Sequence, residues 1–255
     1  MEENKRGKTH GTTILALKYN KGVIMASDRR CVAGSTIFSD EMVKIEELGS
    51  LSCIAGSGAV SDFQYLVKFL RDNLIPHFEK YWDIELFVDG QAKLLECIME
   101  NASLYVWPIL AGWDPCIQKS RIFLFEADGA FFEPRHYTAS GSGERNAMAI
   151  LDNNWSKDCS QARGVEIAVE AILASSKVDV NTSNPLIHPP IIKCMDPEKI
   201  TTVSDKATFK LSWKKFLKDQ ARRGENSDLV KFLFSADSKN IKLEKTINNS
   251  EGEKK

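Results

Sequence analysis

The chain has 255 residues, of which 43% are hydrophobic and 27% are charged. This length and balance are typical of a folded chain with one large core or two small ones, and they exclude a disordered polar segment. The 34 Lys and Arg residues nearly match the 35 Asp and Glu residues, giving a formal net charge of −1. We therefore expect no binding to nucleic acid or to an anionic membrane through an overall positive field.

Targeting and metal-binding signals are missing from the sequence. There is no apolar run of about eighteen residues, and residues 1–11 lack the apolar segment of a signal peptide, so we expect a cytoplasmic protein. The six cysteines show no C-x-x-C spacing and several stand in apolar runs, which favours buried thiols over disulfides or zinc ligands. The four histidines are too dispersed for a metal cluster, and no cluster of residues implies a cofactor.

The first elements in chain order are two pairs of β-prone runs. Residues 12–19 and 22–28 are separated by the turn residues Asn-Lys, which predicts a β-hairpin at the start of the fold. Residues 42–48 and 51–55 predict a second antiparallel pair that turns at Gly-Ser.

Helical periodicity follows. Apolar residues from Phe63 to Leu74 recur at helical spacing, which predicts a long amphipathic helix that continues past Pro76 towards Trp82. Residues 91–105 predict a second helix.

The second half repeats this order. Residues 109–125 and 130–134 form a β-rich block, residues 147–151 and 165–173 have helical patterning, and residues 186–195 are a strand candidate weakened by two prolines. Strands, two helices, strands, two helices and a strand favour an α+β fold with four layers, in which helices cover both outer faces of two packed antiparallel sheets. 

The C-terminal part, residues 204–255, has its own character. Phe209, Trp213, Phe216 and Leu217 predict an amphipathic helix, followed by a polar tail. This helix could pack on its own domain or contact a neighbouring subunit.

Familiar short catalytic motifs such as the P-loop, H-E-x-x-H, G-x-S-x-G and the dinucleotide fingerprint are missing. The informative stretch runs from Gly11 to Gly34 and reads G-T-T-I-L-A-L-K-Y-N-K-G-V-I-M-A-S-D-R-R-C-V-A-G. It resembles the mature N-terminus of proteasome β subunits, most closely those of the bacterial, actinobacterial type. I-A-G-S-G-A (54–59), L-A-G-W-D (110–114) and G-S-G (141–143) continue the resemblance, which covers roughly residues 10–195.

The resemblance implies the αββα sandwich of N-terminal nucleophile (Ntn) hydrolases. It also implies three parts of the chain: a propeptide of residues 1–11, which autoprocessing removes between Gly11 and Thr12; a catalytic domain of residues 12–203; and the C-terminal helix and tail.

The implied nucleophile and base are both in Thr12. A threonine hydroxyl is a weak nucleophile, but the α-amino group of an N-terminal threonine, with an ordinary pKa of about 7.7 to 8.0, can accept its proton through a water. By resemblance, Lys44 supplies positive charge beside the hydroxyl and Asp28 orients Lys44. Each of these could be an ordinary strand or surface residue, but their joint occurrence favours the catalytic interpretation.

The resemblance also implies a supporting set. Gly56 matches the glycine whose N–H faces the developing oxyanion, although it could simply ease a turn. Ser142 matches a serine near the Thr12 amino group, and Asp179 with Thr182 completes the network. The family commonly has two glycines after the position of Thr182, whereas Ser183 and Asn184 stand here, so we expect the loop to be set differently.

The implied substrate pocket consists of Cys31, Met42, Ile54 and Gly58. Its small and apolar side chains favour cleavage after hydrophobic residues. Glu46 is close in sequence to this set and could instead admit a basic side chain.

The expected function is that of a catalytic proteasome β subunit, a threonine endopeptidase that hydrolyses unfolded proteins. The resemblance implies heptameric rings with other β subunits, rings of α subunits and an ATP-dependent unfoldase as partners. Two alternatives remain: a non-catalytic, structural β-type ring subunit, and a stand-alone Ntn amidase acting on a small molecule.

Overall fold

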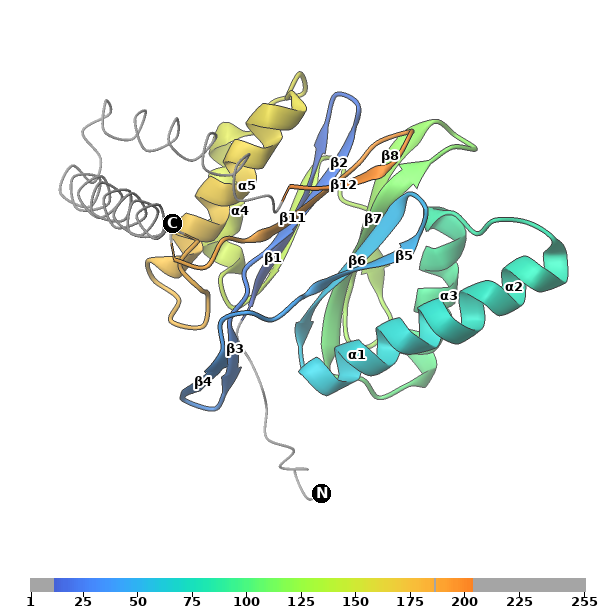
Figure 1. Ribbon diagram of the computed structural model, residues 1–255, viewed down its shortest axis with the longest axis horizontal. Coiled ribbons are helices and arrows are strands. Elements are labelled where there is room, and N and C mark those ends of the chain that lie inside the picture. Colours follow the sequence, from blue (N-terminus) through green and yellow to red (C-terminus); the bar gives the residue numbers. More distant parts are fainter. Residues whose placement is uncertain (1–11, 186, 204–255) are drawn as a thin grey trace, which may run out of the picture. The chain divides into compact units, whose positions relative to one another are not determined.

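The computed structural model describes residues 12–185 and 187–203 (Figure 1). The expected propeptide and the expected C-terminal helix and tail therefore lie outside the described residues. Within the described ranges, every helix is too short or too polar to cross a membrane.

One sheet of five strands contains both ends of the described chain. Its order is β10-β1-β2-β11-β12, and all neighbouring strands are antiparallel. The strands are β1 (Thr13–Tyr19), β2 (Gly22–Ser27), β10 (Tyr137–Gly141), β11 (Ile191–Met195) and β12 (Ile200–Thr202). The predicted hairpin is present with Tyr19 opposite Gly22, and β2 is buried along its whole length because both of its faces are covered.

A second antiparallel sheet of five strands has the order β5-β6-β7-β8-β9. Its strands are β5 (Ile45–Gly49), β6 (Ser52–Gly58), β7 (Val106–Asp114), β8 (Lys119–Phe125) and β9 (Phe131–Phe132). A separate hairpin of β3 (Cys31–Ala33) and β4 (Thr36–Ser39) projects from the sheets. The sequence patterning did not predict this hairpin, because its exposed second strand has no alternating apolar face.

The two large sheets pack face to face around a common core. Ile14 and Met25 of the first sheet meet Ile45, Ile109 and Ile122 of the second, and all five side chains are almost fully buried. The period-two alternation within each strand sends the other residues outward to the helices.

Helices cover the outer face of each sheet, as Figure 1 shows. On the second sheet lie α1 (Val60–Phe69), the π-helical segment η1 (Leu70–Leu74), α2 (Ile75–Trp82) and α3 (Val88–Asn101). Their apolar stripes form a second core with that sheet. On the first sheet lie α4 (Glu144–Asn154) and α5 (Gln161–Ser176). The αββα sandwich expected from the order of elements is confirmed.

Several boundaries differ from those expected. The helix predicted to run from residue 63 to about 82 is continuous in direction but contains η1 before Pro76, which lies in the first turn of α2. The second helix ends at Asn101, and residues 102–105 lead into β7. The last strand candidate begins only at Ile191, after the two prolines, which cannot donate ladder hydrogen bonds.

Candidate active site

Thr12 lies immediately before β1, at the end of the strand that borders β10. Because β1 pairs with β10 so that Thr13 is opposite Gly141, the residues after β10 come beside Thr12. The backbone nitrogen of Thr12 donates to Ser142 Oγ over 3.2 Å. Gly141 has a φ of +101°, and a Cβ there would lie 2.2 Å from the Thr12 carbonyl oxygen, so this close approach requires glycine.

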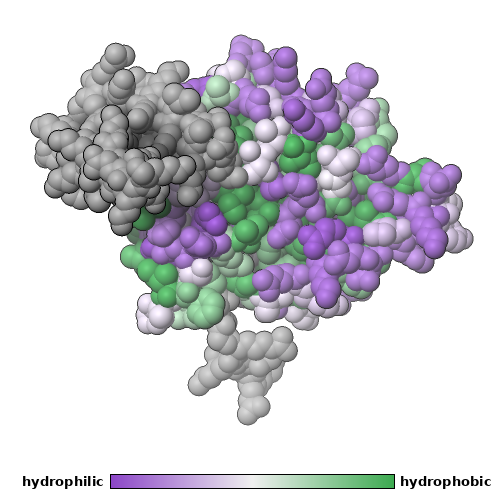
Figure 2. Space-filling view, in the orientation of Figure 1, coloured by the Kyte–Doolittle hydropathy of each residue, from purple (hydrophilic) through white to green (hydrophobic). Residues whose placement is uncertain are grey.

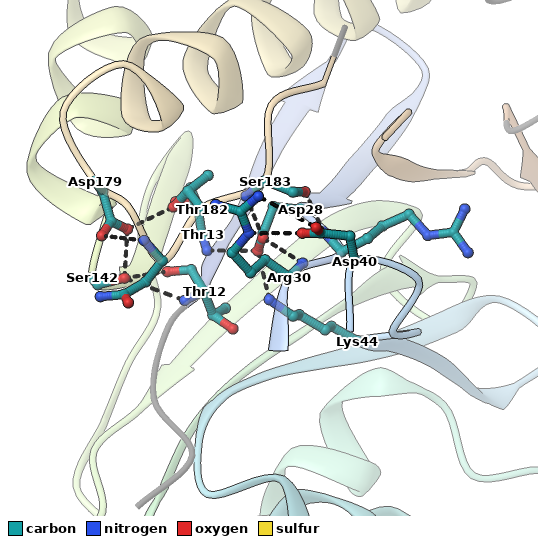
Figure 3. A network of polar contacts seen from close by, with 12 residues as sticks. Thr12, Thr13, Asp28, Arg30, Asp40, Lys44, Ser142, Asp179, Thr182 and Ser183 are labelled. Atoms are coloured by element: carbon teal, nitrogen blue, oxygen red, sulfur yellow. Dashed lines mark hydrogen bonds and ion pairs between the residues drawn. The ribbon is translucent and has the colours of Figure 1, made fainter. Parts of the chain in front are cut away.

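Asp28 directly follows β2 and is fully buried. Its Oδ1 accepts hydrogen bonds from the Thr13 N–H at 2.9 Å and from Lys44 Nζ at 2.7 Å. Its Oδ2 accepts from the N–H groups of Arg30 at 2.8 Å and Ser183 at 3.0 Å. Four donors from four segments therefore fix the orientation of this carboxylate (Figure 3).

Lys44 lies just before β5 and its side chain is 3% exposed. Burial lowers its pKa below the ordinary value of 10.5, and the adjacent Asp28 carboxylate opposes that shift. Lys44 lines the same hollow as Thr12 and Gly56. A cation of this kind can lower the pKa of a neighbouring group and stabilise negative charge that develops beside it.

Asp179, in the loop after α5, connects the remaining polar residues. Its Oδ2 accepts from Ser142 Oγ and from Thr182 Oγ1, each over 2.6 Å. The Thr182 hydroxyl is in turn 2.7 Å from that of Thr13. A continuous chain of hydrogen bonds thus leads from the Thr12 nitrogen through Ser142, Asp179 and Thr182 back to β1 (Figure 3).

The loop that carries Asp179 and Thr182 needs no glycine after Thr182. Neither Ser183 nor Asn184 has a positive φ. The Ser183 N–H binds Asp28, and its Oγ accepts from the Arg29 N–H over 3.0 Å. The serine at this position therefore ties the loop to the segment after β2.

Gly56 lies on β6 with its backbone beside the hollow that Thr12 lines. A Cβ at this position would lie 2.2 Å from the ring of Phe63, which is itself buried. Packing against Phe63 therefore excludes any side chain at Gly56. The backbone of Gly56 faces the hollow that Thr12 lines.

Three of the four expected pocket residues, Cys31, Met42 and Gly58, line that hollow. The free volume is only about 10 Å³, which is about the space that one water needs. Ile54 is not among the lining residues: its side chain is fully buried in the core between the second sheet and its helices. Ile54 stands two residues before Gly56 on β6, so both residues face the helix side of the strand, where Phe63 packs.

Glu46 does not offer a free charge to this hollow. Its carboxylate forms an ion pair with Arg71 of η1 over 3.1 Å, and it lines a different surface hollow beside Val43 and Lys68. The structure therefore places the Glu46 carboxylate beside Arg71 and not among the residues that line the hollow beside Thr12.

Sequence reasoning missed Arg30 and Asp40. Arg30 Nε donates to Asp40 over 2.7 Å, and its Nη1 donates to the Val180 carbonyl over 2.8 Å, so Arg30 joins the loop before β5 to the loop of Asp179. The hydrogen bond from Arg30 lowers the pKa of Asp40 below 3.8. Spacing along the chain carries no signal for these contacts, since Asp40 follows a separate hairpin and Val180 is 150 residues from Arg30.

The described residues contain no group of three or more His, Cys, Asp or Glu that could hold a metal ion. The groups gathered around Thr12 are its own hydroxyl and nitrogen, the buried Lys44, and the carboxylates of Asp28 and Asp179.

Comparison with known proteins identifies the family of this chain. Residues 8–187 match the family described as "Proteasome subunit". "Proteasome subunit beta" of Jonesia denitrificans is 33% identical over 205 residues, 77% of this chain and 68% of that protein. That of Acidimicrobium ferrooxidans is 34% identical over 69% of this chain and 66% of its own length, so the chain spans about two thirds of these relatives. "Proteasome subunit beta 2" of Pyrococcus abyssi is 31% identical over 68% of this chain and 83% of its own. The chain therefore belongs to the proteasome subunit family.

Proposed function

We propose that this chain is a catalytic β subunit of a proteasome core particle, an N-terminal threonine endopeptidase that cleaves unfolded proteins. The single observation that carries the proposal is the hydrogen-bonded set around Thr12: its nitrogen on Ser142, and the buried Lys44–Asp28 ion pair beside the same hollow. Burying a lysine and an aspartate is costly unless they are paired, so retaining both at this position favours a chemical role.

The reaction begins once residues 1–11 have been removed and the Thr12 nitrogen is an amine. The Thr12 hydroxyl oxygen attacks the substrate carbonyl carbon while its proton passes through water to that amine. The Gly56 N–H and the Lys44 charge stabilise the negative charge that develops. The carbon–nitrogen bond breaks, the departing amine takes the proton, and an ester to Thr12 remains. Water then hydrolyses the ester, releasing the acid and restoring the hydroxyl.

The propeptide would leave by the same chemistry. The Thr12 hydroxyl oxygen attacks the Gly11 carbonyl carbon, and its proton passes through water to the Thr12 nitrogen as the bond from Gly11 to that nitrogen breaks. Water then hydrolyses the resulting ester and releases residues 1–11 as a carboxylic acid. Removal of residues 1–11 therefore reports on the nucleophile directly.

The hollow beside Thr12 sets the expected preference. Its walls include Cys31 and Met42, which supports cleavage after apolar residues. Its free volume of about 10 Å³ favours small apolar side chains over large ones.

Assembly with other subunits has support from exposed apolar residues. Phe38 of β4 is 79% exposed and Val180, in the loop of Asp179, is 78% exposed. Figure 2 shows apolar side chains at the surface at the end of the molecule where β3 and β4 lie in Figure 1. Such residues are typical of surfaces that another protein covers. In the proposed particle, the covering proteins are α subunits and other β subunits in rings. An unfoldase acting through the α ring would supply unfolded chains.

A structural, non-catalytic subunit and a stand-alone amidase are the competing functions. The first would not require the paired Lys44 and Asp28, and the second would not require exposed apolar residues such as Phe38.

The test is the intact mass and N-terminal sequence of the particle-bound chain. A chain that begins at Thr12 and hydrolyses peptides supports the proposal, and Thr12→Ala should retain residues 1–11 and lose hydrolysis. A particle that contains the unprocessed chain supports the structural subunit. A processed monomer or dimer supports the amidase.

A further inference from the structure

A second and larger hollow adjoins Thr12. It has a volume of about 380 Å³, within the range of about 300 to 1,000 Å³ typical of ligand sites. Its walls come from the end of β10, the start of α4 and the turn after β8. Thr12 and Gly58 line both hollows, so the two hollows adjoin at the candidate nucleophile.

The two hollows differ in the polar groups that line them. Ser142, which accepts from the Thr12 nitrogen, lines the larger hollow, whereas Lys44 and Gly56 line the smaller one. In the proposed function, on which this inference rests, the Thr12 amine takes up the hydroxyl proton and passes it to the departing amine. The departing amine must therefore lie on the nitrogen side of Thr12. The larger hollow accordingly holds the substrate residue that follows the cleaved bond.

This hollow carries negative charge. Of its lining residues, only Glu126 and Glu144 are charged, and within the described ranges neither carboxylate has a cation as partner. Burial raises the pKa of Glu144 above 4.5, and the nearby charge of Glu126 raises it further. Two carboxylates that repel each other across a hollow are both stabilised when a cation enters between them.

The hollow also has an apolar part. Trp107 and Leu124 lie on its wall together with the two carboxylates. A lysine or arginine side chain suits this combination, because its methylene stem packs on apolar surface while its charged end reaches the carboxylates.

We propose that the hollow lined by Glu126 and Glu144 binds the first residue after the cleaved bond and selects lysine or arginine at that position. The carboxylates act on specificity, since they contact the leaving part of the substrate and not the attacked carbonyl.

The test compares quenched peptides that are identical up to the cleaved bond and carry lysine, norleucine or glutamate immediately after it. Norleucine keeps the apolar stem of lysine without its charge. The assembled particle should cleave the lysine peptide with the highest kcat/KM and the glutamate peptide with the lowest. Each carboxylate should contribute about a two- to fivefold preference for lysine over norleucine, as expected for partly exposed ion pairs.

The variants are Glu126→Gln and Glu144→Gln, singly and together, with Glu198→Gln as the matched control. Glu198 is exposed in the turn after β11 and lines neither hollow. The double variant should bring the lysine-to-norleucine ratio close to one, and the control should leave it unchanged. Added salt should also reduce the ratio in the unchanged protein.

The pH gives an independent readout. Because the pKa of Glu144 is raised, its charge is lost at a higher pH than that of an ordinary glutamate as the pH falls, and the preference for lysine should decline with it. The readout is the ratio of kcat/KM for the lysine peptide to kcat/KM for the norleucine peptide at each pH. In this ratio, the effects of pH on the catalytic steps that both peptides share cancel.

The outcomes separate this inference from the proposed function. Cleavage of all three peptides at equal rates, or a lysine preference that survives in the double variant, would overturn the role of the two carboxylates and leave the threonine peptidase intact. If the assembled particle cleaves none of the peptides, nor an unfolded protein, the proposed function fails and this inference fails with it.

Discussion

Lys44 Nζ lies 2.7 Å from Asp28 Oδ1, and the two side chains are 3% and 0% exposed. Lys44 stands before β5 of one sheet and Asp28 after β2 of the other, so the ion pair joins the two halves of the sandwich at the edge where Thr12 lies. The pair therefore contributes both to the stability of this edge and to the charge beside Thr12.

Replacing Lys44 separates these two contributions. Lys44→Met leaves Asp28 buried without its cation, and it should lower the free energy of unfolding by about 3 to 5 kcal/mol and peptide hydrolysis by about a hundredfold or more. Urea unfolding and kcat/KM measure the two effects. The double variant Lys44→Met with Asp28→Asn should recover part of the stability and none of the activity. Near-normal hydrolysis by either variant would remove Lys44 from the mechanism.

Met42 limits the size of the smaller hollow. Met42→Ala should enlarge it and increase kcat/KM for peptides with leucine before the cleaved bond, relative to alanine, by about tenfold. Val43→Ala is the matched control, because Val43 is 49% exposed and does not line this hollow. An unchanged leucine-to-alanine ratio in Met42→Ala would show that another part of the site selects this residue.

Phe38 tests the proposed assembly. Its ring is 79% exposed at β4, so Phe38→Asp should leave the fold of the subunit intact but prevent or weaken its assembly. Native mass spectrometry measures the assembly, and circular dichroism checks the fold. Phe38→Tyr keeps an aromatic ring and should assemble normally. Full assembly of the aspartate variant would place Phe38 outside any subunit interface.

The cysteines give a prediction about thiol reactivity. Burial raises the pKa of Cys53 to about 12 and that of Cys194 to about 11, and Cys31 and Cys159 are also buried. Only Cys97 and Cys116 are exposed, so iodoacetamide at pH 8 should label two thiols rapidly in the unassembled subunit and all six after denaturation. The variant Cys97→Ser with Cys116→Ser should show no rapid labelling. Fewer than six labels under denaturing, non-reducing conditions would indicate a disulfide.

The order of elements was predictable because local patterns carry it. Alternating and continuous apolar runs indicated β1, β2, β5 and β6, and helical spacing indicated the helices on both outer faces. The hairpin of β3 and β4 was missed, since its conformation depends on what surrounds it and not on an apolar face of its own.

Within the site, family resemblance named Thr12, Asp28, Lys44, Ser142, Asp179 and Thr182, and the structure brings these residues into one network. The family commonly has two glycines after the position of Thr182, where this chain has Ser183 and Asn184. In this chain the hydroxyl and N–H of Ser183 bind the segment after β2 at an ordinary backbone conformation.

Apart from the hairpin of β3 and β4, the sequence by itself therefore determined the main elements, their order and the residue types of the site, since periodicity and motif are properties of neighbouring residues. Tertiary structure alone decided that Ile54 faces the core, that Glu46 is paired with Arg71, and that Glu126 and Glu144 line one hollow beside Thr12. These relationships join segments far apart in the chain, and the packing of two sheets fixes them, which no local pattern encodes.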